Sequence, residues 1–167
     1  FDFYKAAKKA DVKPIIGIEA YVAPESRFDK KRVQWAAGGE DDVSGGGAYT
    51  HMTILAENNE GLSNLFKLSS LASLEGYYYK PRMDRELLTR YSKGLIATTG
   101  CPGGEIQTRL RMGAFKEAMA AASDYRDIFG AENFYLEIMD HGIDIESRVK
   151  ADLLKLGKEL GLPLLAT

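Results

Sequence analysis

Cysteine is nearly absent from this sequence, because Cys101 is the only one among 167 residues. One thiol cannot form a disulfide within the chain, which excludes a small secreted domain held together by disulfides. This usage suits a reducing compartment, and we expect a cytoplasmic protein. Histidine is scarce as well, with only His51 and His141. Any site that uses thiolate or imidazole chemistry must therefore be built from very few residues.

Long apolar runs and a strong charge of one sign are also missing. No segment is apolar for long enough to cross a membrane, and no signal peptide pattern is present. The formal net charge is −2, so contact with nucleic acid would require a local basic patch. Apolar residues make up 45% of the chain and charged residues 28%, which is typical of one globular domain with a real core.

The two ends of the chain look internal. The sequence starts at Phe1 without methionine, and its first residues already have the spacing of a helix. It stops in an apolar segment, 162–167, that is typical of a core strand. Buried strands rarely form a natural terminus, because free chain ends are usually exposed. We therefore expect residues 1–167 to be a single incomplete domain from a longer protein.

The apolar spacing predicts an alternating α/β fold. Strands are expected at 14–22, 51–56, 94–98, 133–139 and 164–166, and helices at 1–11, 59–74, 84–91, 105–112, 115–129 and 144–160. From residue 94 onward strands and helices alternate, which indicates parallel strands in an open sheet or a barrel. Residues 24–49 form a long polar connection, and loops of this length are usually functional or mobile.

Glu19 and His51 are the first two candidate ligands. Glu19 lies inside an apolar strand, where an unpaired buried carboxylate is costly, although strand alternation could also turn it to solvent. His51 opens the next strand and is, taken alone, more typical of a structural histidine. The connection between the two strands contains no evident helix, which favours antiparallel pairing. That pairing would bring His51 close to Glu19.

Cys101 is the third candidate, at a joint where an apolar strand turns through glycines into a helix. It is either a small buried hydrophobe or a metal ligand. Gly100, Gly103 and Gly104 allow close backbone approach, and a helix N-terminus favours a thiolate or a phosphate. A carboxylate, an imidazole and a thiolate together suit zinc, or manganese or iron in a multinuclear cluster.

Two further patterns have a functional and a plainer interpretation. Asp140 and His141 could be a metal pair, or a turn completed by Gly142. A basic cluster followed by Trp35 resembles single-strand nucleic-acid binders, although such a run is more often a solvated loop face. The candidate nucleic-acid contacts in this cluster are Arg27, Lys30, Lys31 and Arg32.

Six segments, taken in order, resemble the polymerase-and-histidinol-phosphatase (PHP) domain of the alpha subunits of bacterial DNA polymerase III. They are residues 13–24, 50–58, 64–70, 75–82, 99–105 and 133–142. The amino-acid sequences of 41–45 and 98–102 are most similar to the actinobacterial form. The resemblance implies an incomplete, distorted, TIM-like β/α barrel, which has seven strands when complete.

The resemblance also implies a cluster of up to three metals held by nine side chains. Glu19, His51 and Cys101 match three of these positions, whereas Asp140 and His141 match none. The remaining ligands belong to motifs expected before Phe1 and after Thr167. The implied activity is 3′–5′ exonuclease proofreading, in which a metal-activated water attacks the terminal phosphodiester.

For the parent chain, the resemblance implies a DNA polymerase that uses magnesium, a DNA primer–template and other polymerase III subunits as partners, and no membrane. Two alternatives stay open. The domain could be a structural module that steadies the polymerase and docks a proofreading subunit. It could also be a free-standing phosphatase of the same superfamily, such as histidinol phosphatase.

Overall fold

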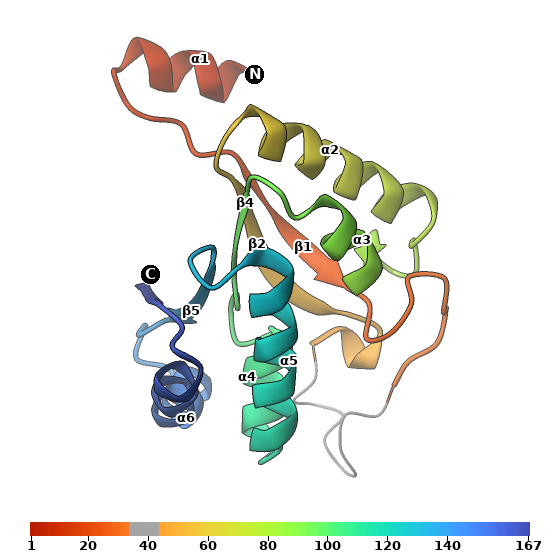
Figure 1. Ribbon diagram of the computed structural model, residues 1–167, viewed down its shortest axis with the longest axis vertical. Helices are drawn as coiled ribbons and strands as arrows, with labels where there is room; N and C mark the ends of the chain where they lie inside the picture. The colour runs from red at the N-terminus through yellow and green to blue at the C-terminus, as the bar shows by residue number, and fades with distance from the viewer. Residues whose placement is uncertain (34–43) are drawn as a thin grey trace.

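The computed structural model describes residues 1–33 and 44–167. Trp35 and the first three residues of the segment 41–45, both noted in the sequence, lie outside the described residues. The described part is a mixed α/β fold with six α-helices and six strands (Figure 1). The helices are α1 (Asp2–Lys9), α2 (Asn59–Leu74), α3 (Arg85–Tyr91), α4 (Glu105–Arg111), α5 (Phe115–Phe129) and α6 (Asp144–Leu160). The strands are β1 (Gly17–Val22), β2 (Thr50–Ala56), β3 (Arg82–Met83), β4 (Leu95–Thr98), β5 (Phe134–Ile138) and β6 (Leu164–Ala166).

The ends of the helices follow from local capping chemistry. The Asn58 side chain accepts a hydrogen bond from the Gly61 N–H at 3.0 Å and starts α2. The Asp84 side chain accepts a hydrogen bond from the Leu87 N–H at 3.0 Å and starts α3. At the end of α6, Gly161 adopts the left-handed conformation that glycine tolerates best. These caps explain why the predicted starts of α2 and α3 and the predicted end of α6 agree closely with the observed ones.

The sheet has the strand order β3-β1-β2-β4-β5-β6. Strands β4, β5 and β6 are parallel, which confirms the interpretation of the second half of the chain. Strand β2 pairs antiparallel with both β1 and β4, so the pairing expected for the first two strands is also confirmed. The sequence missed β3, a two-residue strand parallel to β1. Among the described residues the sheet is open, with β3 and β6 as its edges.

Helices bury one face of this sheet. The alternate strand residues on that face join the apolar core with α2 to α6, and they include Ala20, Val22, Met52, Ile54, Leu95, Ala97, Phe134 and Leu136. In Figure 1, α2 and α3 lie on the β1 side and α6 on the β5 side, whereas α1 stands apart and has no buried residue. No helix in residues 1–33 and 44–167 has the length and apolarity needed to cross a bilayer.

The opposite face of the sheet is polar and only partly covered. The strand register places the residues of this face side by side, because it pairs Glu19 with Thr53, Tyr21 with His51 and Thr53 with Thr98. We call this surface the inner face, defined by Glu19, Tyr21, His51, Thr53, Thr98, Tyr135 and Glu137. The candidate site lies on the inner face.

Candidate metal centre

Glu19, His51 and Cys101 converge at one end of the inner face. Their ligand atoms all lie within 4.8 Å of one another. His51 Nδ1 is 3.0 Å from Glu19 Oε1 and 3.5 Å from Cys101 Sγ. The structure thus brings together the three candidate ligands, which lie far apart in the sequence.

The pairing of β1 with β2 accounts for the first contact. Tyr21 is directly opposite His51, and Glu19 lies two residues away on the same face. Such diagonal neighbours across an antiparallel pair are within reach of long side chains. The Glu19 side chain is 57% exposed and the His51 side chain 22%, so the cluster can be reached from solvent. Solvent exposure of Glu19 and its approach to His51 are therefore compatible.

The turn after β4 brings in the thiol. Gly100 has φ of +72°, a conformation that other residues rarely adopt, and it turns the chain away from the strand. The far side of the turn is tied to β2, because the His51 N–H donates to the Gly103 carbonyl at 3.0 Å. At Gly104 a Cβ atom would lie 2.2 Å from the Thr99 carbonyl, so this position has no room for a side chain. The glycines permit the close backbone approach that the sequence suggested.

Two tyrosines fix the orientation of the His51 ring. Tyr49 stacks on it with ring centroids 5.8 Å apart and an interplanar angle of 8°. Tyr21 meets it edge-on at 5.3 Å. Aromatic contacts of this kind favour one ring orientation, and here that orientation turns Nδ1 toward Glu19 and Cys101.

Burial controls the ionisation of the thiol. It raises the pKa of Cys101 above its ordinary value, and the carboxylates of Glu19 and Glu137 act in the same direction. The Gly103 N–H, which donates to Sγ at 3.4 Å, opposes the rise. Without a cation the thiol therefore stays protonated at neutral pH, and metal binding would release its proton.

The donor set fits a transition metal. Thiolate and imidazole are ligands for zinc and iron, and a carboxylate completes a mixed set that also serves manganese. Hard cations such as magnesium and calcium prefer oxygen donors alone. Glu19, His51 and Cys101 would be the residues that hold the metal.

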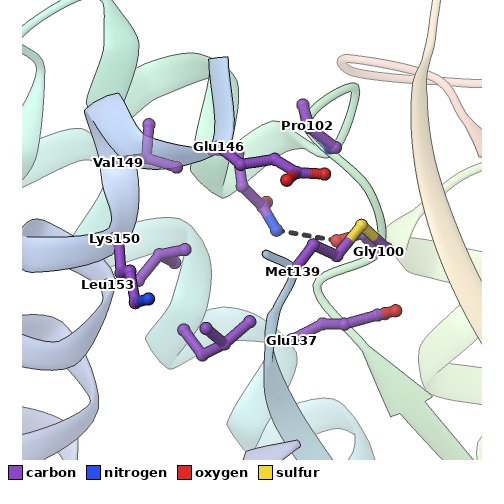
Figure 2. A pocket seen from close by; sticks show the side chains of 10 residues that line it. Gly100, Pro102, Glu137, Met139, Glu146, Val149, Lys150 and Leu153 are labelled. Atoms are coloured by element: carbon purple, nitrogen blue, oxygen red, sulfur yellow. Dashed lines mark hydrogen bonds between the residues drawn. The ribbon is translucent and has the colours of Figure 1, made fainter. Parts of the chain in front are cut away.

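Sequence reasoning missed a buried carboxylate beside this cluster. Glu137 on β5 is 7% exposed and lines a small pocket of about 20 Å³ together with Gly100 and Pro102, the neighbours of Cys101. Figure 2 shows Glu137 extending from its strand away from Lys150 and Leu153. A carboxylate inside an apolar strand was the signal that selected Glu19, and the same signal could have found Glu137.

The remaining candidates lie outside the cluster. His141 is paired with Glu146, its Nδ1 being 2.8 Å from Oε1. Lys30, Lys31 and Arg32 are exposed. Lys31 pairs with Glu25 at 3.3 Å, and the Arg32 guanidinium lies over the Tyr79 ring.

Arg27 is different, because it is only 6% exposed. Its guanidinium donates to Glu75 at 2.7 Å, to Glu86 at 2.8 Å and to Asp84 at 3.1 Å. Burial alone would lower the pKa of Arg27, but these carboxylates raise it above the ordinary value. Nε and Nη1 of Arg27 are thus engaged within the fold, which leaves Lys30, Lys31 and Arg32 as the more accessible cations of this cluster.

The architecture and the cluster define a β/α protein with a carboxylate–imidazole–thiolate group suited to transition metals. The chain belongs to the PHP domain family, whose family model matches residues 1–141. This confirms the resemblance inferred from the motifs.

Curated relatives agree with this assignment. The chain is 63% identical to a DNA polymerase III subunit alpha from Saccharopolyspora erythraea, 57% identical to one from Mycobacterium leprae and 43% identical to one from Thermus aquaticus. Each match covers 99% of the chain but only 15%, 14% and 13% of the relative. The chain thus spans a small part of the length of these relatives, and the similarity to actinobacterial forms is as expected.

Proposed function

We propose that this chain is an internal piece of an alpha subunit of DNA polymerase III. In this proposal residues 1–167 form a single incomplete PHP domain. Strands from the rest of the longer parent protein close the open sheet into a seven-stranded barrel, with the inner face inside. The half-covered inner face and the open edges β3 and β6 support closure, because a barrel would enclose this face and pair those edges.

We propose further that the domain carries a metal-dependent 3′–5′ exonuclease site. The observation that carries this proposal is the convergence of Glu19, His51 and Cys101 within 4.8 Å. When bound, a cluster of zinc, or of manganese or iron, supplies a nucleophilic water at neutral pH and positive charge against the phosphodiester. The carboxylate of Glu19 is exposed, and the aromatic contacts of His51 fix its ring, so a DNA end could reach the metal ligands from solvent.

The exposed cations Lys30, Lys31 and Arg32 are proposed as contacts to the phosphates of that DNA end. They follow β1, whose Tyr21 contacts the ring of His51. Arg27 is not included, because its guanidinium is committed to Glu75, Asp84 and Glu86. The parent chain would act in the cytoplasm as a magnesium-dependent DNA polymerase on a primer–template, with other subunits of the polymerase III holoenzyme.

The test uses the intact protein and the variants Glu19→Gln and Cys101→Ser. We expect each to lose metal, measured by mass spectrometry, and to slow release of 3′-terminal nucleotides from single-stranded DNA by at least about 100-fold, since even indirect changes near a metal cost 10–100-fold. Primer extension should persist. Glu60→Gln, which removes an exposed carboxylate paired with Lys93, is the matched control and should leave both readouts unchanged.

Two outcomes would contradict the exonuclease. Nucleotide release that survives Glu19→Gln and Cys101→Ser would place the activity elsewhere. Bound metal without release, in protein freed of contaminating nucleases, would instead favour the structural module that docks a proofreading subunit.

A further inference from the structure

We infer that Glu137, acting through Thr98, is a positioning residue for the turn that presents Cys101; this inference rests on the proposed metal site. The Thr98 hydroxyl donates to Glu137 Oε2 at 2.5 Å and accepts from the Gly100 N–H at 3.1 Å. One hydroxyl therefore links a carboxylate on β5 to the backbone one residue before the thiol. We call this chain of contacts the Glu137–Thr98 relay.

The relay lies in the interior of the protein. Thr98 is 1% exposed and Glu137 is 7% exposed. The second carboxylate oxygen of Glu137 accepts from the Thr167 hydroxyl at 2.9 Å, so both oxygens take part in hydrogen bonds. Burying a carboxylate among hydroxyl groups is expensive compared with an apolar residue of the same size. The need to hold the turn before Cys101 in place explains why a carboxylate is buried at this position.

A second set of bonds holds the other side of Gly100. The Thr99 hydroxyl accepts from the Glu137 N–H at 3.0 Å and from Gln107 Nε2 at 2.9 Å. Gln107 Nε2 also donates to the Gly100 carbonyl at 2.8 Å, the bond drawn as a dashed line in Figure 2. Both backbone polar groups of Gly100 thus have partners: the N–H bonds to Thr98 on β4, which is itself bonded to Glu137 on β5, and the carbonyl bonds to Gln107 on α4.

This support has a consequence for the ligand that follows. Gly100 is buried in a left-handed conformation, where its N–H and carbonyl need partners that regular strand pairing cannot supply. Without these partners the turn could relax, and Cys101 would move relative to His51 and Glu19. Metal sites depend on such outer contacts to hold their ligands, and losing one typically costs 10–100-fold in affinity.

The experiment compares Thr98→Val, which removes the hydroxyl, with Thr98→Ser, which keeps it, in the intact protein. Zinc affinity is measured by competition with a chromophoric chelator. We expect Thr98→Val and Glu137→Ala to bind zinc about 10–100-fold more weakly, and Thr98→Ser to bind it like the unaltered protein. Leu68→Ala, a buried change in α2, controls for loss of stability alone and should not alter zinc affinity.

A second readout needs no metal. The rate at which iodoacetamide alkylates Cys101 in metal-free protein, followed on its peptide by mass spectrometry, should rise in Thr98→Val and Glu137→Ala, since a relaxed turn exposes the thiol. Zinc affinity and alkylation rates equal to those of Leu68→Ala would overturn the relay. If Cys101→Ser leaves zinc affinity intact, the metal site itself fails. The alkylation rates then decide the relay alone: faster alkylation supports it and an unchanged rate overturns it.

Discussion

At the scale of single residues, Cys101 adds a sulfur donor to the carboxylate of Glu19 and the imidazole of His51. Its thiol is half-buried and its pKa is raised by burial, so the metal-free protein holds it as a neutral group. A bound cation would convert it to a thiolate and gain a strong bond. Metal binding and folding are then linked at this residue.

Replacing Cys101 by alanine in the intact protein tests that link. We expect lower metal content and a lower melting temperature, since a 100-fold loss of affinity removes about 2.7 kcal/mol of metal-linked stability. Differential scanning calorimetry with and without a chelator is the measurement. The two proteins should melt alike once both are metal-free. Equal melting and equal metal content before chelation would show that Cys101 is not a ligand.

Glu146 provides a second residue-scale test, based on pH. Its Oε2 accepts the His141 backbone N–H at 2.7 Å, and that bond lowers the pKa of Glu146 against the opposing effect of burial. The His141 ring also lowers this pKa, whereas the charge of Asp140, itself paired with Lys150, raises it. The pKa of Glu146 is thus lower in the folded than in the unfolded protein. The carboxylate therefore stabilises the fold fully above the unfolded pKa of about 4.3, and this stabilisation disappears as pH falls through the folded pKa.

We therefore expect Glu146→Gln to reduce the hydrogen-exchange protection of the His141 amide at pH 7. The difference from the unaltered protein should narrow as pH falls toward about 4 and below. His141→Ala keeps the residue 141 backbone N–H, so it should retain most of the protection at that amide. A difference that stays constant across this pH range would contradict the role of the Glu146 carboxylate.

At the scale of elements, β3 shows how a short strand can organise several loops. Arg82 is fully buried, and its guanidinium donates to four backbone carbonyls, those of Gly76, Ala48, Arg27 and Asp29, at 2.9–3.1 Å. The carbonyls of Arg27, Asp29 and Ala48 belong to the connection between β1 and β2, and that of Gly76 lies just after α2. One planar cation thus joins three parts of the chain, a task that its fork of donors suits.

Arg82→Ala should lower the opening free energy of this region by about 3–5 kcal/mol, because it leaves buried acceptors without donors. The Ala23 amide, bonded to the Met83 carbonyl at 2.8 Å, is the reporter in hydrogen-exchange measurements. Arg82→Lys keeps the charge but loses the fork and should fall between. Arg32→Ala, an exposed change, should have little effect. Unchanged protection in Arg82→Ala would refute this account of β3.

Helices and strands could be predicted from the sequence where the residues that determine them lie within the element itself. Helices such as α2 and α6 carry their own periodicity and caps, so their bounds could be predicted from the sequence. Strand β3 has two residues and no pattern, and it exists because Arg82 and Met83 fit beside β1. Such a strand depends on tertiary contacts that no short window of sequence contains.

The same reasoning explains which site residues could be found. Glu19 and His51 were brought together by a connectivity argument, since a connection without an evident helix favours antiparallel pairing. The contact between Thr98 and Glu137 spans 39 residues and depends on the register of β4 with β5. For Arg27, the basic run around it gave no sign of the distant carboxylates that enclose it.

At the scale of the whole molecule, the asymmetry of the sheet is the dominant feature. Helices α2 to α6 bury one face, while the inner face keeps Tyr21, Thr53 and Tyr135 only partly covered. The edges β3 and β6 present unpaired backbone groups in the described part of the chain. Exposed edges of this kind favour association between sheets.

Residues 1–167 expressed alone should therefore be poorly stable, self-associate and lack nuclease activity. Analytical ultracentrifugation together with urea denaturation measures this. A stable monomer with one cooperative unfolding transition would argue against an incomplete barrel, and would indicate that the inner face needs no further cover.

The central claim, that Glu19, His51 and Cys101 hold a metal, is tested most directly by X-ray absorption at the zinc edge. The sample is the intact protein loaded with zinc, compared with its Cys101→Ser variant. The account predicts a sulfur neighbour at about 2.3 Å from zinc that disappears in the variant. Spectra that show only nitrogen and oxygen neighbours, or a sulfur signal that the substitution leaves unchanged, would contradict it.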